Sequence, residues 1–438
     1  MFRLQIRPSS RSSSLRFLVV ALVLLAIVHL YLSLPVEAKY RSKWSWNSGN
    51  DDDVCGAFSG LERVVITVKT GATEAPEKLP TQLRTSLRCA PYVYVFSDME
   101  QKIGETQIYD ALDTIPAEVK DGNSDFDIYR KQQELQDPAK IVSILRDFKD
   151  PRRPEDLAAW TLDKYKNLHI VEKAWALQPD MDWYFHIDAD TYVIWSSLLA
   201  WIQRLDPSKE SFLGSLSFIV GKPFAHGGSG MLLSNAATRN FLSHNGTAAQ
   251  WDSKMHENCC GDWVLAQVLH EYGIEVMNSW PTINGETPDT IPFASDHWCQ
   301  PLVTMHHITP ADAERLGNFE QRRQNKSAPV LYSEIFKDLI FDTIPDSLED
   351  WDNKSEDEAV SGIGSAEDCT EACAHNPDCF QSLYTGDGCT LGTKNFRFGE
   401  KHKPEDGKRW QSSWNRTRIA AWASKQKPCA GATFPFQD

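Results

Sequence analysis

The chain has 438 residues, of which 41% are hydrophobic, so it is long enough for one large domain and a smaller one. Its 45 basic and 60 acidic side chains give a net charge of −15. No basic stripe follows the N-terminal residues, so the charge pattern argues against nucleic acid as a partner.

The first 34 residues are typical of a cytosolic tail followed by a membrane anchor. Residues 17–34 are almost wholly apolar, and at about 1.5 Å per residue they would span about 27 Å, close to the thickness of a bilayer core. No acidic residue and four basic ones precede this segment, namely Arg3, Arg7, Arg11 and Arg16. The positive-inside rule therefore places residues 1–16 in the cytosol and the rest of the chain in the lumen. A signal peptide cleaved after Val36-Glu37-Ala38 is the alternative, and it delivers the chain to the same compartment.

Two further features fit a secretory lumen. Four N-x-[ST] acceptor sequences begin at Asn245, Asn325, Asn353 and Asn415. The ten cysteines show no zinc-finger spacing with histidines, so disulfide bonds are expected.

The residues after the anchor are predicted to form a stem and then a large α/β domain. Residues 35–55 are polar and rich in aspartate, which indicates a flexible stem. Residues 56–341 carry strand patterns at 64–68, 92–96 and 183–187, with helical patterns at 79–88 and 163–177. Alternating strands and helices predict a parallel sheet.

The C-terminal third is predicted to hold a linker and a second, small unit. Residues 342–365 are crowded with acidic side chains and end in a glycine- and serine-rich stretch, which indicates a linker. Residues 366–430 are rich in cysteine, and a unit of this size needs disulfides to supplement its core. We expect the catalytic domain to fold without this unit, unless Cys429 pairs with a cysteine before Asp342.

The strongest chemical signal is Asp188-Ala189-Asp190, directly after the predicted strand at 183–187. Ligands bind beyond the carboxyl ends of strands in open α/β sheets. Side chains two positions apart in an extended segment point the same way, so both carboxylates can face one cation. Such oxygen ligands suit Mg²⁺ or Mn²⁺ on a diphosphate. A solvated turn is the alternative interpretation.

Two segments resemble glycosyltransferase family 31, the group that includes Fringe and core 1 β-1,3-galactosyltransferase. They are residues 182–193, which contain both aspartates, and residues 224–234, which contain Gly227-Gly228-Ser229-Gly230. The resemblance covers roughly residues 61–308 and is greatest to the fungal members that carry a C-terminal cysteine-rich module. It implies a GT-A fold, a Golgi membrane enzyme, inversion at the anomeric carbon, a Mn²⁺ cofactor, a UDP-sugar donor and commonly a β-1,3 linkage.

The resemblance also assigns roles to individual residues. Asp188, Asp190 and His306 fall on the metal ligands, with His307 as the neighbouring alternative to His306. The remaining implied contacts are those of Asp98 with the uridine and of Gly228 with the floor of the donor or acceptor cleft; a tight loop before a strand is the alternative for the glycines.

Asp262 resembles the family's catalytic base, which takes the proton of the acceptor hydroxyl. It precedes an amphipathic helical pattern that Gly273 closes, so an N-cap role is the alternative. Trp251, Trp280 and Trp298 are candidates for stacking on sugar rings, although most of the 15 tryptophans are expected to pack internally.

The cysteine-rich unit resembles a PAN/apple domain, which implies the bridges Cys369–Cys389 and Cys373–Cys379 and a role in binding protein or carbohydrate. A passive cap on the catalytic domain is the alternative. Vicinal Cys259 and Cys260 are expected to seek separate partners.

These features favour a type II Golgi transferase that moves a hexose or N-acetylhexosamine from a UDP-sugar to a glycan or glycoprotein hydroxyl. A non-catalytic, lectin-like protein with a degenerate GT-A domain is the main rival, and a hydrolase of sugar nucleotides is a weaker one. Acidic residues at Asp188, Asp190 and Asp262 count against the lectin.

Overall fold

The computed structural model describes residues 52–404 and 407–436. The predicted cytosolic tail, the anchor at 17–34 and nearly all of the stem lie outside the described residues. Among the helices that are described, none has both the length and the apolar character that crossing a bilayer requires.

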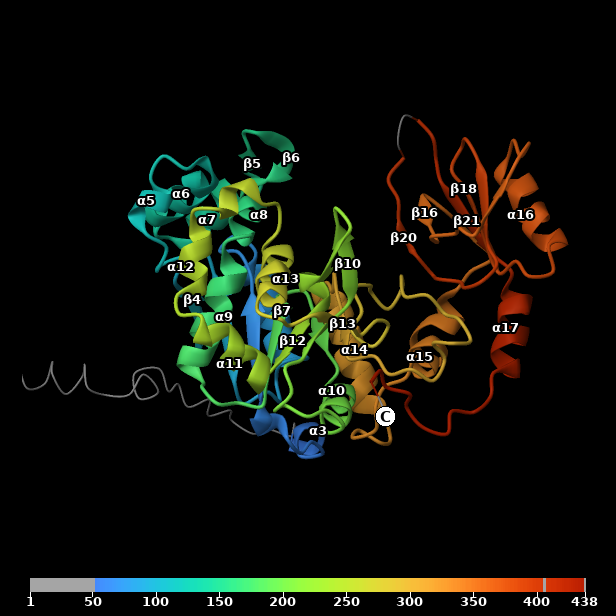
Figure 1. Cartoon of the computed structure of the whole chain (residues 1–438). Coiled ribbons are helices and arrows are strands. Elements are labelled where there is room, and N and C mark those ends of the chain that lie inside the picture. The colour runs from blue at the N-terminus through green and yellow to red at the C-terminus, as the bar shows by residue number, and fades with distance from the viewer. Residues whose placement is uncertain (1–51, 405–406, 437–438) are drawn as a thin grey trace, which may run out of the picture.

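The main domain is built on one mixed sheet of eight strands (Figure 1). In spatial order these are β13 (Val276–Asn278), β9 (Phe212–Gly214), β12 (Met231–Ser234), β7 (Trp183–Asp188), β1 (Val64–Lys69), β2 (Val93–Ser97), β4 (Thr106–Asp110) and β3 (Gln101–Ile103). The strands β7, β1, β2 and β4 are parallel, whereas β12 runs antiparallel to both β7 and β9. The predicted α/β class is therefore confirmed.

Helices cover both faces of this sheet, which explains why its central strands read as continuous apolar runs. One face packs against α9 (Lys166–Leu177), α11 (Asn235–Ser243) and α13 (Gly261–Glu271). The other face packs against α4 (Ala75–Arg84) and α10 (Trp195–Ile202). Along β12, Leu232 enters one core and Met231 and Leu233 enter the other, as the alternation of a strand requires.

The order of the strands places a ligand site. From β1 the chain moves outward to β2 and β4, and it then returns to form β7 on the opposite side of β1. This reversal makes a switch point between β1 and β7, and crevices open beyond the carboxyl ends of strands at such points.

Smaller elements complete the main domain. They are α5 (Ala117–Lys120), α6 (Asp127–Leu135), α7 (Pro138–Leu145), the hairpin β5 (Lys149–Asp150) and β6 (Arg153–Leu157), α8 (Ala158–Asp163), the hairpin β10 (Leu216–Ile219) and β11 (Lys222–Ala225), and α12 (Thr247–Asp252). A further antiparallel pair joins β8 (Tyr192–Val193) to β14 (Thr304–Met305).

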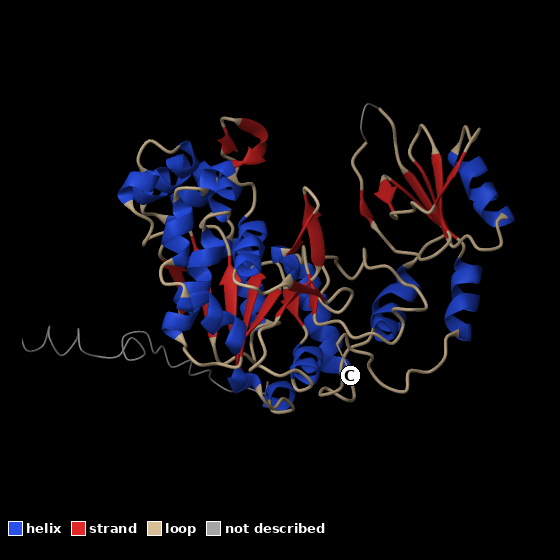
Figure 2. Cartoon of the chain, viewed as in Figure 1, coloured by secondary structure: helices blue, strands red, loops and turns tan. Residues whose placement is uncertain are grey.

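The C-terminal unit is a separate antiparallel sheet with one helix against it (Figure 2). Its strands, in spatial order, are β15 (Ser347–Glu349), β21 (Gln411–Trp414), β18 (Gln381–Tyr384), β19 (Cys389–Gly392) and β17 (Glu358–Val360). The helix α16 (Ala366–His375) carries Cys369 and Cys373, which bond Cys389 and Cys379. The two bridges implied by the resemblance are confirmed.

The predicted linker is wrong over residues 347–360. This stretch forms β15, β17 and the short strand β16 (Trp351–Asp352), which pairs with β20 (Glu400–Lys401). The acidic side chains of this stretch lie on the exposed edge strands of a small sheet, and these strands are paired with their neighbours. Of the sequons, Asn353 is fully buried and donates its amide to the carbonyl of Ser382, so it is not an accessible acceptor.

The C-terminal unit is covalently linked to the main domain and packs against it. A disulfide joins Cys299 to Cys429, which contradicts the expectation that the unit is independent. The backbone N–H of Phe293 also donates to the carbonyl of Phe396 at 2.9 Å. One apolar cluster contains residues of α14 (Pro310–Arg322), α15 (Tyr332–Ile335) and the C-terminal unit. The two parts share this cluster in addition to the apolar clusters that each forms alone.

Candidate active site

A partly buried ion pair marks the switch point. Lys69 and Asp188 are register partners at the carboxyl ends of β1 and β7, and Nζ of Lys69 lies 3.2 Å from Oδ1 of Asp188. Asp163 also pairs with Lys69. Burial alone would lower the pKa of Lys69, but the carboxylates of Asp163 and Asp188 raise it well above its ordinary value. The lysine is therefore a fixed positive charge beside Asp188.

A fully buried lysine supports the same edge from α9. Nζ of Lys166 lies 3.3 Å from Oδ1 of Asp163 and donates to the carbonyl of Thr70 at 2.7 Å. Asp98, at the end of β2, accepts the backbone N–H of Ala72 at 2.7 Å. These contacts hold the loop after β1 in place.

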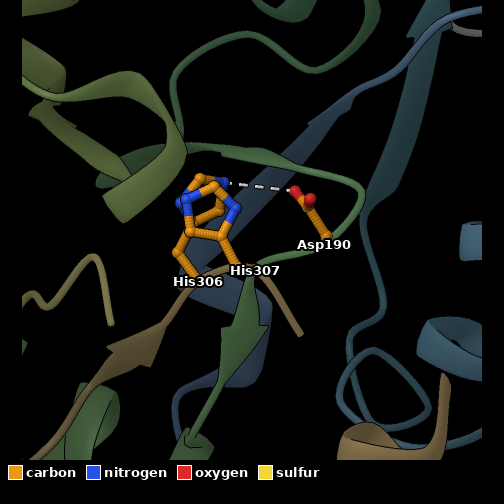
Figure 3. A group of neighbouring side chains, drawn as sticks. All are labelled: Asp190, His306 and His307. Carbon is orange, nitrogen blue, oxygen red and sulfur yellow. Dashed lines mark ion pairs between the residues drawn. The ribbon is translucent and has the colours of Figure 1, made fainter. Parts of the chain in front are cut away.

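Asp190 meets two histidines from a distant part of the sequence (Figure 3). Because β14 pairs with β8, His306 arrives directly after β14 and its Nε2 lies 3.2 Å from Oδ1 of Asp190. His307 completes a group of three whose ligand atoms all lie within 4.8 Å of one another. Burial opposes ionisation of Asp190, but the hydrogen bond from His306 and the charge of Lys78 lower its pKa.

Lys78 of α4 faces the same carboxylate. Its Nζ lies 3.0 Å from Oδ2 of Asp190 and 3.2 Å from Oε1 of Glu74. Asp188 and Asp190 thus each pair with a lysine, and Asp188 is not part of the group formed by Asp190 and the histidines.

Gly228 forms a cradle for the imidazole of His306. It belongs to the short helix η3 (Gly227–Ser229), and its carbonyl accepts a hydrogen bond from Thr191 Oγ1 at 2.7 Å. A Cβ atom at this position would lie 2.2 Å from Cε1 and 2.4 Å from Nε2 of His306. Only glycine allows the ring to occupy its present place.

The carboxylate of Asp262 is held beside this loop. Its Oδ2 accepts the backbone N–H of Gly227 and its Oδ1 accepts that of Trp263, both at 2.8 Å. Asp262 is the second residue of α13, whose N-cap is Cys260. Asp262 is therefore not the N-cap residue, although one of its oxygens accepts an N–H of the first turn of the helix and the other accepts one from the glycine loop.

The residue that caps α13 belongs to a vicinal disulfide. Cys259 bonds Cys260, and within the described residues no cysteine is free. The expectation of separate partners is wrong, because the other cysteines pair among themselves, including Cys55 with Cys89.

These groups line one cleft of about 220 Å³. Its wall contains three acidic residues, two glycines of the loop and the disulfide, together with a lysine and two histidines: Asp163, Asp188, Asp262, Gly227, Gly228, Cys259, Cys260, Lys69, His226 and His306. The cleft therefore brings together a carboxylate that can accept a proton, Asp262, and a carboxylate and an imidazole that can bind a cation, Asp188 and His306.

The structure brings together most of the predicted site residues. Gly228, Asp188, Asp262 and His306 line the cleft, and Asp190 contacts His306. Asp98 does not line it, because its side chain is fully buried beneath the loop after β1.

Sequence analysis did not identify two lysines and one tryptophan of the site, namely Lys69, Lys78 and Trp160. Lys69 and Lys78 gave little signal because lysine is usually a surface residue, although Lys69 ends a buried strand as Asp188 does. Trp298 is buried in the core shared with the C-terminal unit, whereas the unpredicted Trp160 lines the cleft.

A family model described as Fringe-like matches residues 59–281, just over half of the chain. This range contains β1, β7, the glycine loop and Asp262, and it ends before His306 and the C-terminal unit. The chain therefore belongs to the Fringe-like family, within glycosyltransferase family 31.

Proposed function

We propose that the protein is an inverting, metal-dependent glycosyltransferase that moves a hexose or N-acetylhexosamine from a UDP-sugar to a hydroxyl of a glycan or glycoprotein. The observation that carries this proposal is that Asp262, Asp188 and His306 line one cleft, with Asp190 in contact with His306. Membership of the Fringe-like family supports the reaction class. A GT-A fold and a β-1,3 linkage are the corresponding expectations.

The chemistry of the cleft suits a divalent cation, and we propose Mn²⁺. Asp190 and His306 supply a carboxylate and an imidazole, His307 lies beside them, and Asp188 lines the same cleft as His306. Within the described residues, Nδ1 of His306 is buried and has no hydrogen-bond partner. No protein group therefore holds a proton on this nitrogen. Imidazole favours Mn²⁺ over Mg²⁺. When bound, the cation would neutralise the charge that grows on the departing diphosphate.

The charged side chains of the cleft would orient the donor. The ammonium group of Lys69 lines the cleft and stays protonated, so it would be available to contact the diphosphate of the donor. Gly227 and Gly228 present backbone without side chains, which lets the donor or the acceptor approach closely.

Asp262 would act as the base. Each of its oxygens accepts one backbone N–H, which fixes the carboxylate and leaves further lone pairs for an acceptor hydroxyl. As that hydroxyl oxygen attacks the anomeric carbon, its proton passes to Asp262 and the bond to the UDP oxygen breaks with its electron pair. Attack opposite the leaving group inverts the anomeric carbon.

The apolar segment at 17–34 and the arginines before it support a type II Golgi membrane topology with a lumenal catalytic domain. The small disulfide-bonded sheet supports an apple-like module, which we propose binds glycan or protein near the enzyme's acceptor.

The test is the variant Asp262→Asn. The amide oxygen can still accept the N–H of Gly227, but the side chain can no longer take a proton, so transfer should fall by about 10²–10⁴-fold. Calorimetry should show unchanged affinity for UDP in Mn²⁺. Asp312→Asn is the matched control, because Asp312 is also an acid in the first turn of a helix, where it forms a capping box with Thr309. Equal loss of stability in both variants without a separate loss of transfer would contradict the role of base.

A further inference from the structure

A second cavity continues the cleft. It has a volume of about 450 Å³ and is lined by residues of the β5–β6 hairpin, α8 and the segment before α13. Four residues line both cavities, namely Trp160, Lys164, Cys259 and Cys260. The catalytic groups Asp188, Asp262 and His306 line only the first. The volume lies in the range of about 300–1,000 Å³ that is typical of small-molecule sites.

The shared wall offers apolar surface at the junction. Trp160 is 58% exposed although it is a large aromatic residue. The vicinal disulfide lines the same junction, and Asp262 follows Cys260 by two residues along the chain. Indole rings bind the apolar faces of sugar rings by stacking. A sugar at this junction would therefore lie next to the sugar whose hydroxyl faces Asp262.

The charges of the second cavity compensate one another. Nη2 of Arg152 lies 2.8 Å from Oδ2 of Asp150, and Nη1 of Arg153 lies 3.8 Å from Oδ2 of Asp156. Nζ of Lys164 lies 2.9 Å from Oδ2 of Asp125, which is buried and does not itself line the cavity. Asp150 also accepts the hydroxyl of Thr161 at 2.7 Å. The paired side chains can still form hydrogen bonds with hydroxyl groups of a ligand. Their charges cancel, so they leave no net positive charge to attract an acidic ligand. This pattern favours a neutral ligand over an acidic one.

We infer that the second cavity is an acceptor subsite, and that it binds the penultimate sugar of a neutral glycan against Trp160. The terminal sugar of that glycan then occupies the first cavity and presents its hydroxyl to Asp262. The acceptor is accordingly an oligosaccharide of at least two sugars. This inference rests on the proposed transferase function and extends it to the size and charge of the acceptor.

The experiment compares Trp160→Ala with the unaltered full chain on paired acceptors. The probes are methyl glycosides of galactose, glucose, mannose and N-acetylglucosamine, together with neutral disaccharides that end in the same sugars. The rate of UDP release gives kcat/KM for each acceptor, and release without acceptor gives donor hydrolysis. Trp280→Ala is the matched control, because Trp280 is 41% exposed and lines neither cavity.

We expect Trp160→Ala to lower kcat/KM by at least about 10-fold for disaccharides and by less than about 3-fold for monosaccharides. Donor hydrolysis and Mn²⁺–UDP affinity should stay unchanged, and Trp160→Phe should restore most of the loss. Equal loss on both acceptor sizes, or no loss on either, would overturn the inference.

A binding measurement separates this inference from the proposed function. Saturation-transfer NMR of the same disaccharides with the unaltered chain and with Trp160→Ala needs no turnover. Contact with the unaltered chain that Trp160→Ala loses supports the subsite even if no UDP-sugar is consumed. Absence of contact with every disaccharide overturns it, even if transfer to monosaccharides proceeds.

Discussion

Substitution of Gly228 by alanine tests how the position of one imidazole controls the site. The new Cβ would lie 2.2 Å from Cε1, 2.4 Å from Nε2 and 2.8 Å from Nδ1 of His306, whereas ordinary contacts begin near 3.4 Å. Gly228 is not among the residues with positive φ, so alanine is compatible with the backbone there. The ring of His306 must therefore move by about 1 Å, which separates its Nε2 from Asp190.

A displacement of this size has a large effect on chemistry and a small one on folding. A misplacement of about 1 Å in a catalytic group costs about 10²-fold in rate. Moderate overpacking costs about 1–3 kcal/mol of stability. We therefore expect kcat/KM for UDP release to fall by about 10²-fold, weaker Mn²⁺ binding, and a folded protein.

The assay is a Mn²⁺ titration by electron paramagnetic resonance, run beside UDP release. Gly364→Ala is the matched control, because nothing lies within 4 Å of a Cβ at that position. High Mn²⁺ concentrations should recover part of the lost rate of Gly228→Ala. If Gly228→Ala keeps both the Mn²⁺ affinity and the rate of the unaltered chain, the placement of His306 by this glycine does not matter to the site.

Two predictions concern stability. Burial raises the pKa of Glu320 from 4.5 to about 7, so the stability that its protonated form gives is fully present below pH 4.5 and is lost as the pH rises through 7. Glu320→Gln should flatten the decline of Tm between pH 5 and 8. The corresponding change in the free energy of unfolding is at most about 3 kcal/mol. If Tm of the variant falls with pH as steeply as that of the unaltered chain, the assignment to Glu320 is wrong. The Cys299–Cys429 bridge spans 130 residues, so replacing both cysteines by serine should lower the free energy of unfolding by about 3–5 kcal/mol in denaturant titrations. A loss below 1 kcal/mol would show that the shared core alone holds the two parts together.

The central strands could be predicted from sequence because both faces of the sheet are covered. The pattern at 64–68 became β1 and that at 183–187 became β7, since every residue of β1 before Lys69 is buried. The strands at 347–360 could not be predicted, because their partners lie far along the chain and their exposed edges tolerate charge. Short edge strands carry too little apolar pattern to stand out from a linker.

The site was predictable only in part, for a related reason. Asp188 and Asp190 follow a buried strand, and that position alone indicates a ligand site. His306 depends on the pairing of β14 with β8, which no local pattern reveals, so only the family resemblance pointed to it. The exposure of Trp160 in a cavity is likewise a tertiary property, and among 15 tryptophans it could not be singled out.

One measurement tests the central claim most directly: a screen of UDP-sugars for UDP release in Mn²⁺, with neutral oligosaccharide acceptors, run in parallel on the unaltered chain and on Asp190→Ala. The account predicts that the unaltered chain releases UDP from one donor and adds that sugar to an acceptor, as the product mass shows. It also predicts that EDTA or Asp190→Ala abolishes both, because Asp190 contacts His306 at the metal site. Undiminished turnover of Asp190→Ala in EDTA, or no turnover of any donor by the folded unaltered chain, would contradict it.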